Sequence, residues 1–470
     1  MAALHELSAL ELAAHFADRS VSPVEAVEAA LARIAAWEPA INAMYRVDAD
    51  GARAAAREAE ARWRAGRPRS PLDGVPITIK DNIATRGDPT PVGTRANEDA
   101  PVATEDAPPA ARVREAGCVL LGKTTMPDFG MLSSGLSSLH GLTRNPWRTD
   151  RNTSGSSSGA GAACAARYAP LHLGTDIGGS VRLPATHCGI FALKPSLGRV
   201  PVYPPFIGRV TGPMTRSVLD AAALMNAIAR PDARDFMQLP PQDEDYLARA
   251  RDADAGWLKG LRIGLLLDAG SGLAPHPEIV AATRAAAQAL EDAGAGVEPV
   301  AGFLVPELLE GMQRFFEARS YNDYMALPHE RQKKVLPFIV EWCTWRAKDF
   351  SGRDVMAAYN AYVQMRDVTA RATEPFDFVL SPTSPILPYE AELPCPGNDP
   401  HDALPHIAFT VAYNMSEQPA ASLNWTTSAD GLPIGVQVAG RRFDDGGVLR
   451  LAAVLEDLRP AQAGWPEPAG

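Results

Sequence analysis

The chain has 470 residues, of which 46% are hydrophobic, so it can bury a large core, and its length alone permits up to about three domains. Its formal net charge of -11 is spread along the sequence without a lysine and arginine block, which excludes an electrostatic nucleic-acid partner. Five scattered cysteines without a CxxC pair, no membrane-length apolar run and no signal-like N-terminus together predict a soluble cytoplasmic protein, with no membrane association.

The first 67 residues predict helices. Apolar residues recur at helical spacing over residues 4–37, and Ser22-Pro23-Val24-Glu25 is a typical start signal for the second helix of this segment. Alanine and arginine then dominate to about Arg67, which predicts a third helix.

From residue 68 onward, strand-like and helical segments alternate. VPITIK is a short β-branched run that ends in Lys80, which indicates a buried strand with a cation at its end. The further predicted elements are a helix over 110–117, a strand over 118–123, a strand over 171–174 and a helix after Ser180. This order predicts an α/β fold.

The region 236–398 is more variable. Residues 262–267, 278–293 and 296–300 predict a strand-helix-strand unit, and helical segments rich in aromatic residues follow it. Strand character returns at 376–386 and 432–440. Because no repeat or linker interrupts the chain, we predict one domain over 1–470, divided into N-terminal helices (1–67), a core (68–235), a partly helical insertion (236–398) and a C-terminal return to the core (399–470).

Two sequence motifs match known patterns in the wrong context. GCVLLGKT (117–124) fits the phosphate-loop pattern, but a helix precedes it and its middle residues form the predicted strand, so it cannot wrap around phosphate. GSSSG (155–159) fits the nucleophile elbow with Ser157 as nucleophile, but polar, turn-prone residues stand where that motif needs a buried strand. We therefore reject the α/β-hydrolase elbow and keep nucleotide binding only as a remote alternative, which ATP titration would test.

The stretch TSGSSSGAGAA (153–163) has the composition of a flexible tether, yet it lies between two strand-like segments of one folded unit. A second cluster, Gly178-Gly179-Ser180, follows it within an apolar sequence. Together with Lys80, these serines supply the parts of a Ser-Lys hydrolase, because a buried lysine that is neutral can take a proton from a serine.

Six segments carry a resemblance to a known family. They are LDGVPITIKDNI (72–83), EAGCVLLGKTTMPDFGM (115–131), RNPW (144–147), SGSSSGAGAA (154–163), LGTDIGGSVRLPATHCGIFALKPS (173–196) and NMSEQPAASLNWTTSADGLPIGVQVAGRRFD (414–444). With the N-terminal helices, they resemble the amidase signature family over nearly the whole chain. The resemblance implies the amidase signature fold, a large mixed central β-sheet flanked by many α-helices on both faces, and a bacterial amidase.

The resemblance also implies the roles of the site residues. Ser180 is then the nucleophile, Ser156 a bridging serine in a cis peptide, and Lys80 the base. The turn Ile177-Gly178-Gly179-Ser180 is expected to aim backbone N–H groups at the oxyanion. Asp176 and Arg182 are expected to fix that turn, with Ser157 in a supporting role. Phe129, Gly130 and Met131, in the loop after GKT, are expected to line the substrate pocket.

The chain departs from the family pattern at two positions. Ser154-Gly155 stands where relatives commonly have two glycines, and His187 stands where they have phenylalanine. His187 could contact substrate, but the interpretation we favour is a buried hydrogen bond. A cysteine nucleophile at Cys188 is the weaker interpretation, because a free cysteine in apolar sequence is more often inert core.

The resulting hypothesis is a hydrolase that cleaves a small-molecule carboxylic amide through a serine acyl-enzyme, with no metal and no cofactor. The alternatives are a carbamate or ester hydrolase on the same triad and a protein resembling the A subunit of glutamyl-tRNA amidotransferase. An aryl or alkyl amide is favoured over a charged one, and the family suggests a homodimer.

Overall fold

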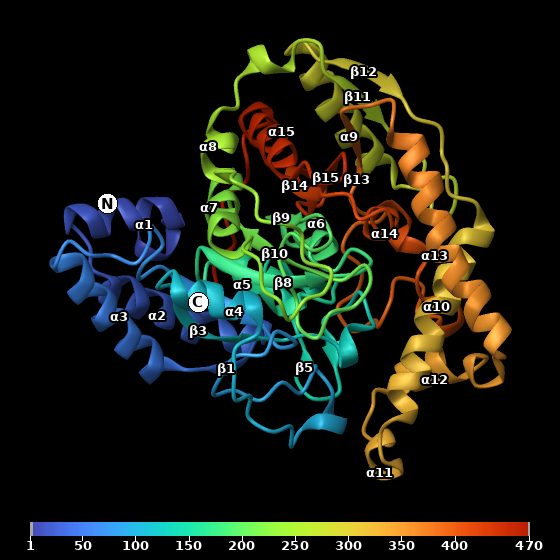
Figure 1. The fold of residues 1–470 in the computed structure, drawn as a ribbon, viewed down its shortest axis with the longest axis horizontal. Helices are drawn as coiled ribbons and strands as arrows, with labels where there is room; N and C mark the ends of the chain where they lie inside the picture. The colour runs from blue at the N-terminus through green and yellow to red at the C-terminus, as the bar shows by residue number, and fades with distance from the viewer. Residues whose placement is uncertain (1–2, 469–470) are drawn as a thin grey trace.

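The computed structural model describes residues 3–468, and its main feature is a mixed sheet of 11 strands (Figure 1). In spatial order the strands are β1 (Met44–Val47), β3 (Val119–Thr124), β2 (Pro76–Lys80), β8 (Leu171–Asp176), β10 (Val210–Thr215), β9 (Phe191–Lys194), β14 (Ala420–Thr427), β15 (Pro433–Gly440), β13 (Phe378–Pro382), β11 (Arg262–Leu265) and β12 (Gly296–Pro299). β2 is parallel to both β3 and β8, whereas β10 is antiparallel to both of its neighbours.

Helices cover both faces of this sheet. They are α4 (Pro108–Glu115), α5 (Ser158–Ala165), α6 (Arg182–Cys188), α7 (Val218–Ile228), α8 (Tyr246–Arg251), α9 (Pro277–Asp292), α14 (Ala408–Met415) and α15 (Asp445–Leu458). In β9, Phe191 and Leu193 share a core with α7 and α15, whereas Ala192 points to the opposite face and packs with α5 and α6. The predicted α/β class with a large mixed sheet and helices on both faces is confirmed.

The three N-terminal helices are confirmed as α1 (Ala9–Asp18), α2 (Pro23–Ile41) and α3 (Ala49–Arg64). Capping boxes start α1 at Ser8 and α2 at Ser22, which agrees with the start signal in the sequence. The sequence missed β1, which pairs antiparallel with β3 at the edge of the sheet. Its four residues are too few, and only the first is buried, so no alternation reveals the strand.

The more variable region contains the predicted strand-helix-strand unit as β11, α9 and β12. These strands and β13 extend the same sheet as the core. The remaining helices of this region are α10 (Pro306–Met325), α11 (His329–Gln332), α12 (Pro337–Thr344) and α13 (Gly352–Thr373). In Figure 1 they stand on the right, at the opposite end of the molecule from α1, α2 and α3. None of the helices in the described residues combines the length and apolar character needed to cross a bilayer.

The structure agrees with our interpretation of the phosphate-loop and nucleophile-elbow matches. β3 occupies Val119–Thr124 directly after α4, so the GKT segment is a strand and not a phosphate-binding loop. The serines at 156–158 follow a small hairpin, in which β6 (Arg144–Asn145) pairs with β7 (Arg148–Asn152), and not a strand of the main sheet. A second short hairpin joins β4 (Leu136–Ser137) and β5 (Gly141–Leu142).

The parallel pairing of β2 and β8 positions the polar groups of the core. Ile79 pairs with Leu173, so the carboxyl ends of both strands meet at one edge of the sheet. Lys80 ends β2, and Thr175 and Asp176 end β8 at the same edge. The serine-rich segment reaches this edge because α5 begins there and its backbone packs very closely against Thr125. If Gly159 carried a Cβ atom, that atom would lie only 2.4 Å from the Thr125 backbone nitrogen.

Candidate active site

Lys80 is fully buried at the end of β2, and hydroxyl groups surround its amine. Its Nζ lies 2.8 Å from Ser156 Oγ, 3.0 Å from Ser157 Oγ and 3.0 Å from Thr175 Oγ1. A cis peptide joins Gly155 to Ser156, as the family resemblance implied. The structure therefore brings together three groups that are far apart in the sequence.

The hydrogen bonds around Lys80 determine which of the neighbouring hydroxyl groups can donate a proton to its amine. The Ser157 hydroxyl can donate to the Thr175 carbonyl at 3.2 Å, and the Thr175 hydroxyl can donate to Asn82 Oδ1 at 3.3 Å. Ser157 Oγ and Thr175 Oγ1 can then each accept a hydrogen bond from Lys80, which uses the two N–H groups that a neutral amine carries. Ser156 Oγ makes no other hydrogen bond within residues 3–468, so its proton can point at the remaining lone pair of Lys80 Nζ.

Burial lowers the pKa of Lys80 to about 7, against the opposing charges of Asp176 and Asp81. Two other buried lysines also have lowered pKa values, about 8 for Lys123 and about 7 for Lys194, again mainly because of burial. Those two donate to the backbone carbonyls of Ile83 and Pro195. Hydroxyl contacts, and not the pKa alone, therefore distinguish Lys80 from the other two lysines.

Ser180 lies in the loop between β8 and α6, partly exposed in a pocket. The backbone N–H of Ser157 donates to the Ser180 carbonyl at 3.1 Å, which holds the two serine segments together. Ser156 lies behind the pocket residue Gly130, since a Cβ added to Gly130 would lie 3.2 Å from Ser156 Oγ. Ser180 thus lines the pocket, and the predicted relay serine lies next to it behind the wall.

The structure narrows the predicted set of oxyanion donors. The N–H of Gly179 donates to Asp176 Oδ1 at 2.8 Å, so this amide is already engaged and is not a free donor. Within the described part of the chain, the N–H groups of Ile177, Gly178 and Ser180 make no hydrogen bond. All three residues line the pocket.

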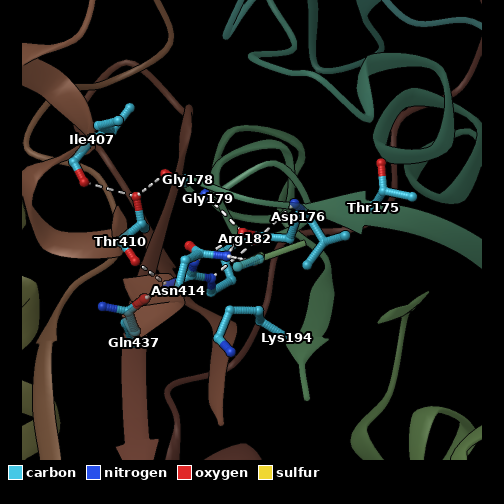
Figure 2. A network of polar contacts seen from close by, with 12 residues as sticks. Thr175, Asp176, Gly178, Gly179, Arg182, Lys194, Ile407, Thr410, Asn414 and Gln437 are labelled. Carbon is cyan, nitrogen blue, oxygen red and sulfur yellow. Dashed lines mark hydrogen bonds and ion pairs between the residues drawn. The ribbon is translucent and has the colours of Figure 1, made fainter. Parts of the chain in front are cut away.

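Asp176 and Arg182 form a buried ion pair beneath the loop (Figure 2), with 3.0 Å between Arg182 Nη2 and Asp176 Oδ1. Burial alone would raise the pKa of Asp176, but the Arg182 charge and hydrogen bonds from Arg182, Val181 and Asn414 outweigh it and hold the pKa well below its usual range. Arg182 also donates to Asn414 Oδ1 at 2.6 Å and to Gln437 Oε1 at 2.8 Å. The predicted pair is therefore the centre of a larger network.

Thr410 of α14 holds the loop from the other side (Figure 2). Its hydroxyl can donate to the Gly178 carbonyl at 2.6 Å, or to the Ile407 carbonyl at 2.9 Å. A Cβ on Gly179, whose φ is +128°, would lie 2.5 Å from Thr410 Oγ1, so only glycine fits there. Contact with Thr410 fixes the peptides between residues 177 and 180.

The pocket beside Ser180 has a volume of about 490 Å³, including its open mouth. The predicted residues Phe129, Gly130 and Met131 form one wall, in and directly after the 3-10 turn Asp128–Gly130. Phe316 of α10 and Trp342 of α12 contribute an apolar wall on the other side. The pocket is thus shared by the core and by the helices of the variable region.

His187 and Cys188 are both buried and take no part in the site. Backbone hydrogen bonds with Ile386 and Asn152 only partly offset the effect of burial on the pKa of the His187 ring. Burial lowers the His187 pKa to about 4, and its ring packs edge-on against Tyr389. Burial also raises the pKa of Cys188 well above its usual value, which agrees with an inert core thiol.

Sequence reasoning missed several residues that complete the site. Asn82 and Thr175 bind the lysine cluster, while Thr410, Asn414 and Gln437 support the loop. Asn82 and Thr175 stand next to predicted residues, in TIKDN and GTDIGG, and Asn414 and Gln437 lie within the C-terminal segment that resembles the family. Their polar side chains in otherwise apolar sequence were the available signal.

Known proteins resemble this chain along almost its whole length. It is 36% identical to the A subunit of the glutamyl-tRNA(Gln) amidotransferase of Myxococcus xanthus, over 96% of this chain and 97% of the relative. It is 35% identical to an acylamidase of Rhodococcus erythropolis, over 97% of this chain and 96% of the relative.

Solved structures also resemble this chain along almost its whole length. A bacterial aryl acylamidase of the amidase signature family superposes with a TM-score of 0.89 at 29% identity, covering 97% of this chain and 96% of that chain. The peptide amidase of Stenotrophomonas maltophilia superposes with a TM-score of 0.84 at 28% identity and 99% coverage of both chains. The Amidase family model matches residues 25–449. This chain belongs to the amidase signature family and is an amidase.

Proposed function

We propose that the protein hydrolyses a carboxylic amide through an acyl-enzyme on Ser180, with Ser156 as proton relay and Lys80 as base. The observation that carries this proposal is the Lys80 amine, fully buried and within 3.0 Å of three hydroxyl oxygens. Only Ser156 among these hydroxyls has its proton free for the amine lone pair.

In the first step, Ser180 Oγ attacks the substrate carbonyl carbon while its proton passes to Ser156, whose own proton passes to Lys80. The carbonyl oxygen becomes an oxyanion, which the N–H groups of Ile177, Gly178 and Ser180 can stabilise. One such donor is worth about 2.7–4 kcal/mol in comparable sites.

In the second step, the carbon–nitrogen bond breaks, and the proton returns from Lys80 through Ser156 to the leaving amine. The acyl group then remains as an ester on Ser180. A water molecule attacks this ester, the same relay takes the water proton, and the carboxylic acid leaves as Ser180 recovers its proton. The cycle consumes one amide and one water and needs no cofactor.

The test is hydrolysis of a panel of amides, carbamates and esters by the wild type, Ser180→Ala and Lys80→Ala. We expect Ser180→Ala to lose about 10⁴-fold or more in kcat, by analogy with other serine hydrolases. Mass spectrometry after rapid quenching should show the acyl group on Ser180. Full turnover by Ser180→Ala would contradict the mechanism, and faster cleavage of carbamates or esters than of amides would favour that alternative substrate class.

A second candidate function is that of one component of an amidotransferase complex. Its support is the identity with the Myxococcus xanthus protein over nearly both chains. Such a component is expected to be inactive on simple amides alone and to copurify with a partner, whereas the amidase proposal requires turnover by the isolated chain. Light scattering on the same preparation also tests the homodimer suggested by the family.

A further inference from the structure

Arg319 of α10 is the one charged side chain in the lining of the pocket beside Ser180, as far as residues 3–468 describe it. The lining is otherwise apolar or carries small polar groups, with Phe316 and Trp342 on the same side as Arg319. A charged residue in such a wall needs a partner, because removing a cation from water is costly.

The guanidinium of Arg319 is poorly paired within the protein. Its side chain is 23% exposed, and its one ion-pair partner in the described residues, Asp323, lies 3.9 Å away and is itself 40% exposed. This distance is too long for a hydrogen bond, and the guanidinium makes none with the described residues. It lies instead over the Phe206 ring, with Cζ 4.3 Å from the ring centroid.

Arginines close to Arg319 are paired much better. Arg346 donates to both carboxylate oxygens of Glu317 and also contacts Glu310, and Arg314 donates to Glu310 at 2.9 Å. Arg314 and Arg346 thus have carboxylate partners at hydrogen-bond distance, whereas the donors of Arg319 make no hydrogen bond with the described residues.

The surroundings of Arg319 add to its positive charge. Arg209 also contacts the Phe206 ring, with Cζ 5.7 Å from the centroid, and burial followed by the charge of Arg319 lowers the Arg209 pKa to about 10. The charges of Asp323 and Asp235 oppose this shift but are outweighed by burial and by Arg319. This side of the pocket thus favours an anion.

The position of the proton relay indicates which part of the substrate occupies this pocket. The leaving amine must face Ser156 and Lys80, since it receives its proton from them. The pocket lining contains Ser180 and the amides of Ile177 and Gly178 but not Lys80. A second hollow, lined by Asn82 and Thr175, lies next to Lys80. The acyl part therefore enters the pocket that contains Arg319.

We propose that the acyl part of the substrate ends in a carboxylate that pairs with Arg319, so that the preferred substrate is a monoamide of a dicarboxylic acid. This inference rests on the proposed function and names the substrate class of the same site. It revises the expectation from the sequence, which favoured an uncharged aryl or alkyl amide. Guanidinium and carboxylate form two parallel hydrogen bonds when geometry allows, which explains why an arginine is used.

The experiment compares kcat/KM for two series of anilides, monoanilides of dicarboxylic acids with four to eight carbons, and n-alkanoyl anilides of matched length. For at least one length we expect the wild type to prefer the acid by about 10- to 100-fold, the range typical of a charge-assisted pair. Arg319→Gln should lose this preference and bring the ratio close to one. Arg319→Lys should retain part of it.

Arg314→Gln is the matched control, because it removes an arginine one turn away on α10 that does not line the pocket. It should keep the wild-type ratio, and circular dichroism establishes that each variant is folded. A wild-type ratio close to one at every length, or an unchanged ratio in folded Arg319→Gln, would overturn the inference while leaving amide hydrolysis intact. Undiminished turnover by Ser180→Ala would instead overturn the proposed function.

Discussion

Two regions of the molecule face each other across the pocket, and they are held in different ways. Hydrogen bonds fix the loop from Asp176 to Arg182, and three side chains of the C-terminal region, those of Thr410, Asn414 and Gln437, take part in them. The opposite wall, on α10 and α12, is held by apolar packing and by ion pairs such as Arg346 with Glu317. Polar networks specify one geometry, whereas apolar contacts tolerate change.

This difference separates the reaction from the choice of substrate. Transition-state stabilisation depends on donors placed to within a fraction of an ångström, which the loop network can provide. A pocket wall needs only a suitable shape and, at Arg319, one charge. Changes on the loop side should therefore act on kcat and stability, and changes on the helical side should act on KM and selectivity.

The largest effect is expected from Arg182→Met, which leaves the Asp176 carboxylate buried without its cation. Breaking such a pair costs about 3–5 kcal/mol of folding free energy. The folded fraction should also lose about 100-fold or more in kcat, since the loop loses its support. Arg199→Met is the control, because Arg199 pairs with the buried Asp445 outside the site. Equal losses of kcat per folded molecule in both variants would contradict the comparison.

The pH dependence of kcat/KM should be set by Lys80 in the core and not by the helical wall of the pocket. Lys80 must be neutral to accept a proton, and its pKa lies at about 7. The value of kcat/KM should therefore fall about tenfold per unit as pH drops below 7, and level off above about 8. Lys194→Met tests the assignment, because Lys194 has a similar pKa but contacts no serine. A midpoint that moves in this variant would count against Lys80 as the titrating group.

Thr410→Val should have a smaller effect. The substitution keeps the shape of the side chain but removes the bond to the Gly178 carbonyl, so we expect kcat to fall about 3- to 30-fold with little change in KM. Thr369→Val removes a comparable buried bond, from a hydroxyl to the Met365 carbonyl within α13, and should lose stability only. Matching kinetics in the two variants would mean that Thr410 does not position the loop.

The smallest effect is expected from Phe316→Leu in the helical wall. This change removes apolar contact area from the pocket, which is worth about 1 kcal/mol and thus a few-fold in KM for acyl groups that reach the wall. The pH midpoint and kcat should stay at their wild-type values. Steady-state kinetics on short and long acyl chains provide the measurement, and a shift in the pH midpoint would show that the two regions are coupled.

Much of the fold was predictable because several strands carry dense β-branched or apolar runs, as in 75–80, 262–267 and 432–440. β14 was missed because AASLNWTT mixes alanine and polar residues, which do not alternate regularly. α5 was missed because its small residues are buried on all sides and so have no amphipathic pattern. In both cases tertiary packing, not local preference, determines the structure.

The site was predictable in part for a similar reason. Lys80, Ser156 and Ser180 stand in segments that resemble the amidase signature family, and that resemblance grouped them. Thr410, Asn414 and Gln437 are single polar residues whose partners lie more than 200 positions away, and no local pattern reveals such bonds. The engagement of the Gly179 amide depends on the direction of one side chain, which only the structure defines.

The support of the loop by Asn414 and Gln437 also bears on biosynthesis. Both residues lie near the C-terminus, whereas the lysine and serines that they serve emerge from the ribosome much earlier. A nascent chain without this last portion lacks the acceptors for the Arg182 guanidinium and the hydroxyl that anchors the Gly178 peptide. Without these contacts, the loop from Asp176 to Arg182 loses its support from the C-terminal region.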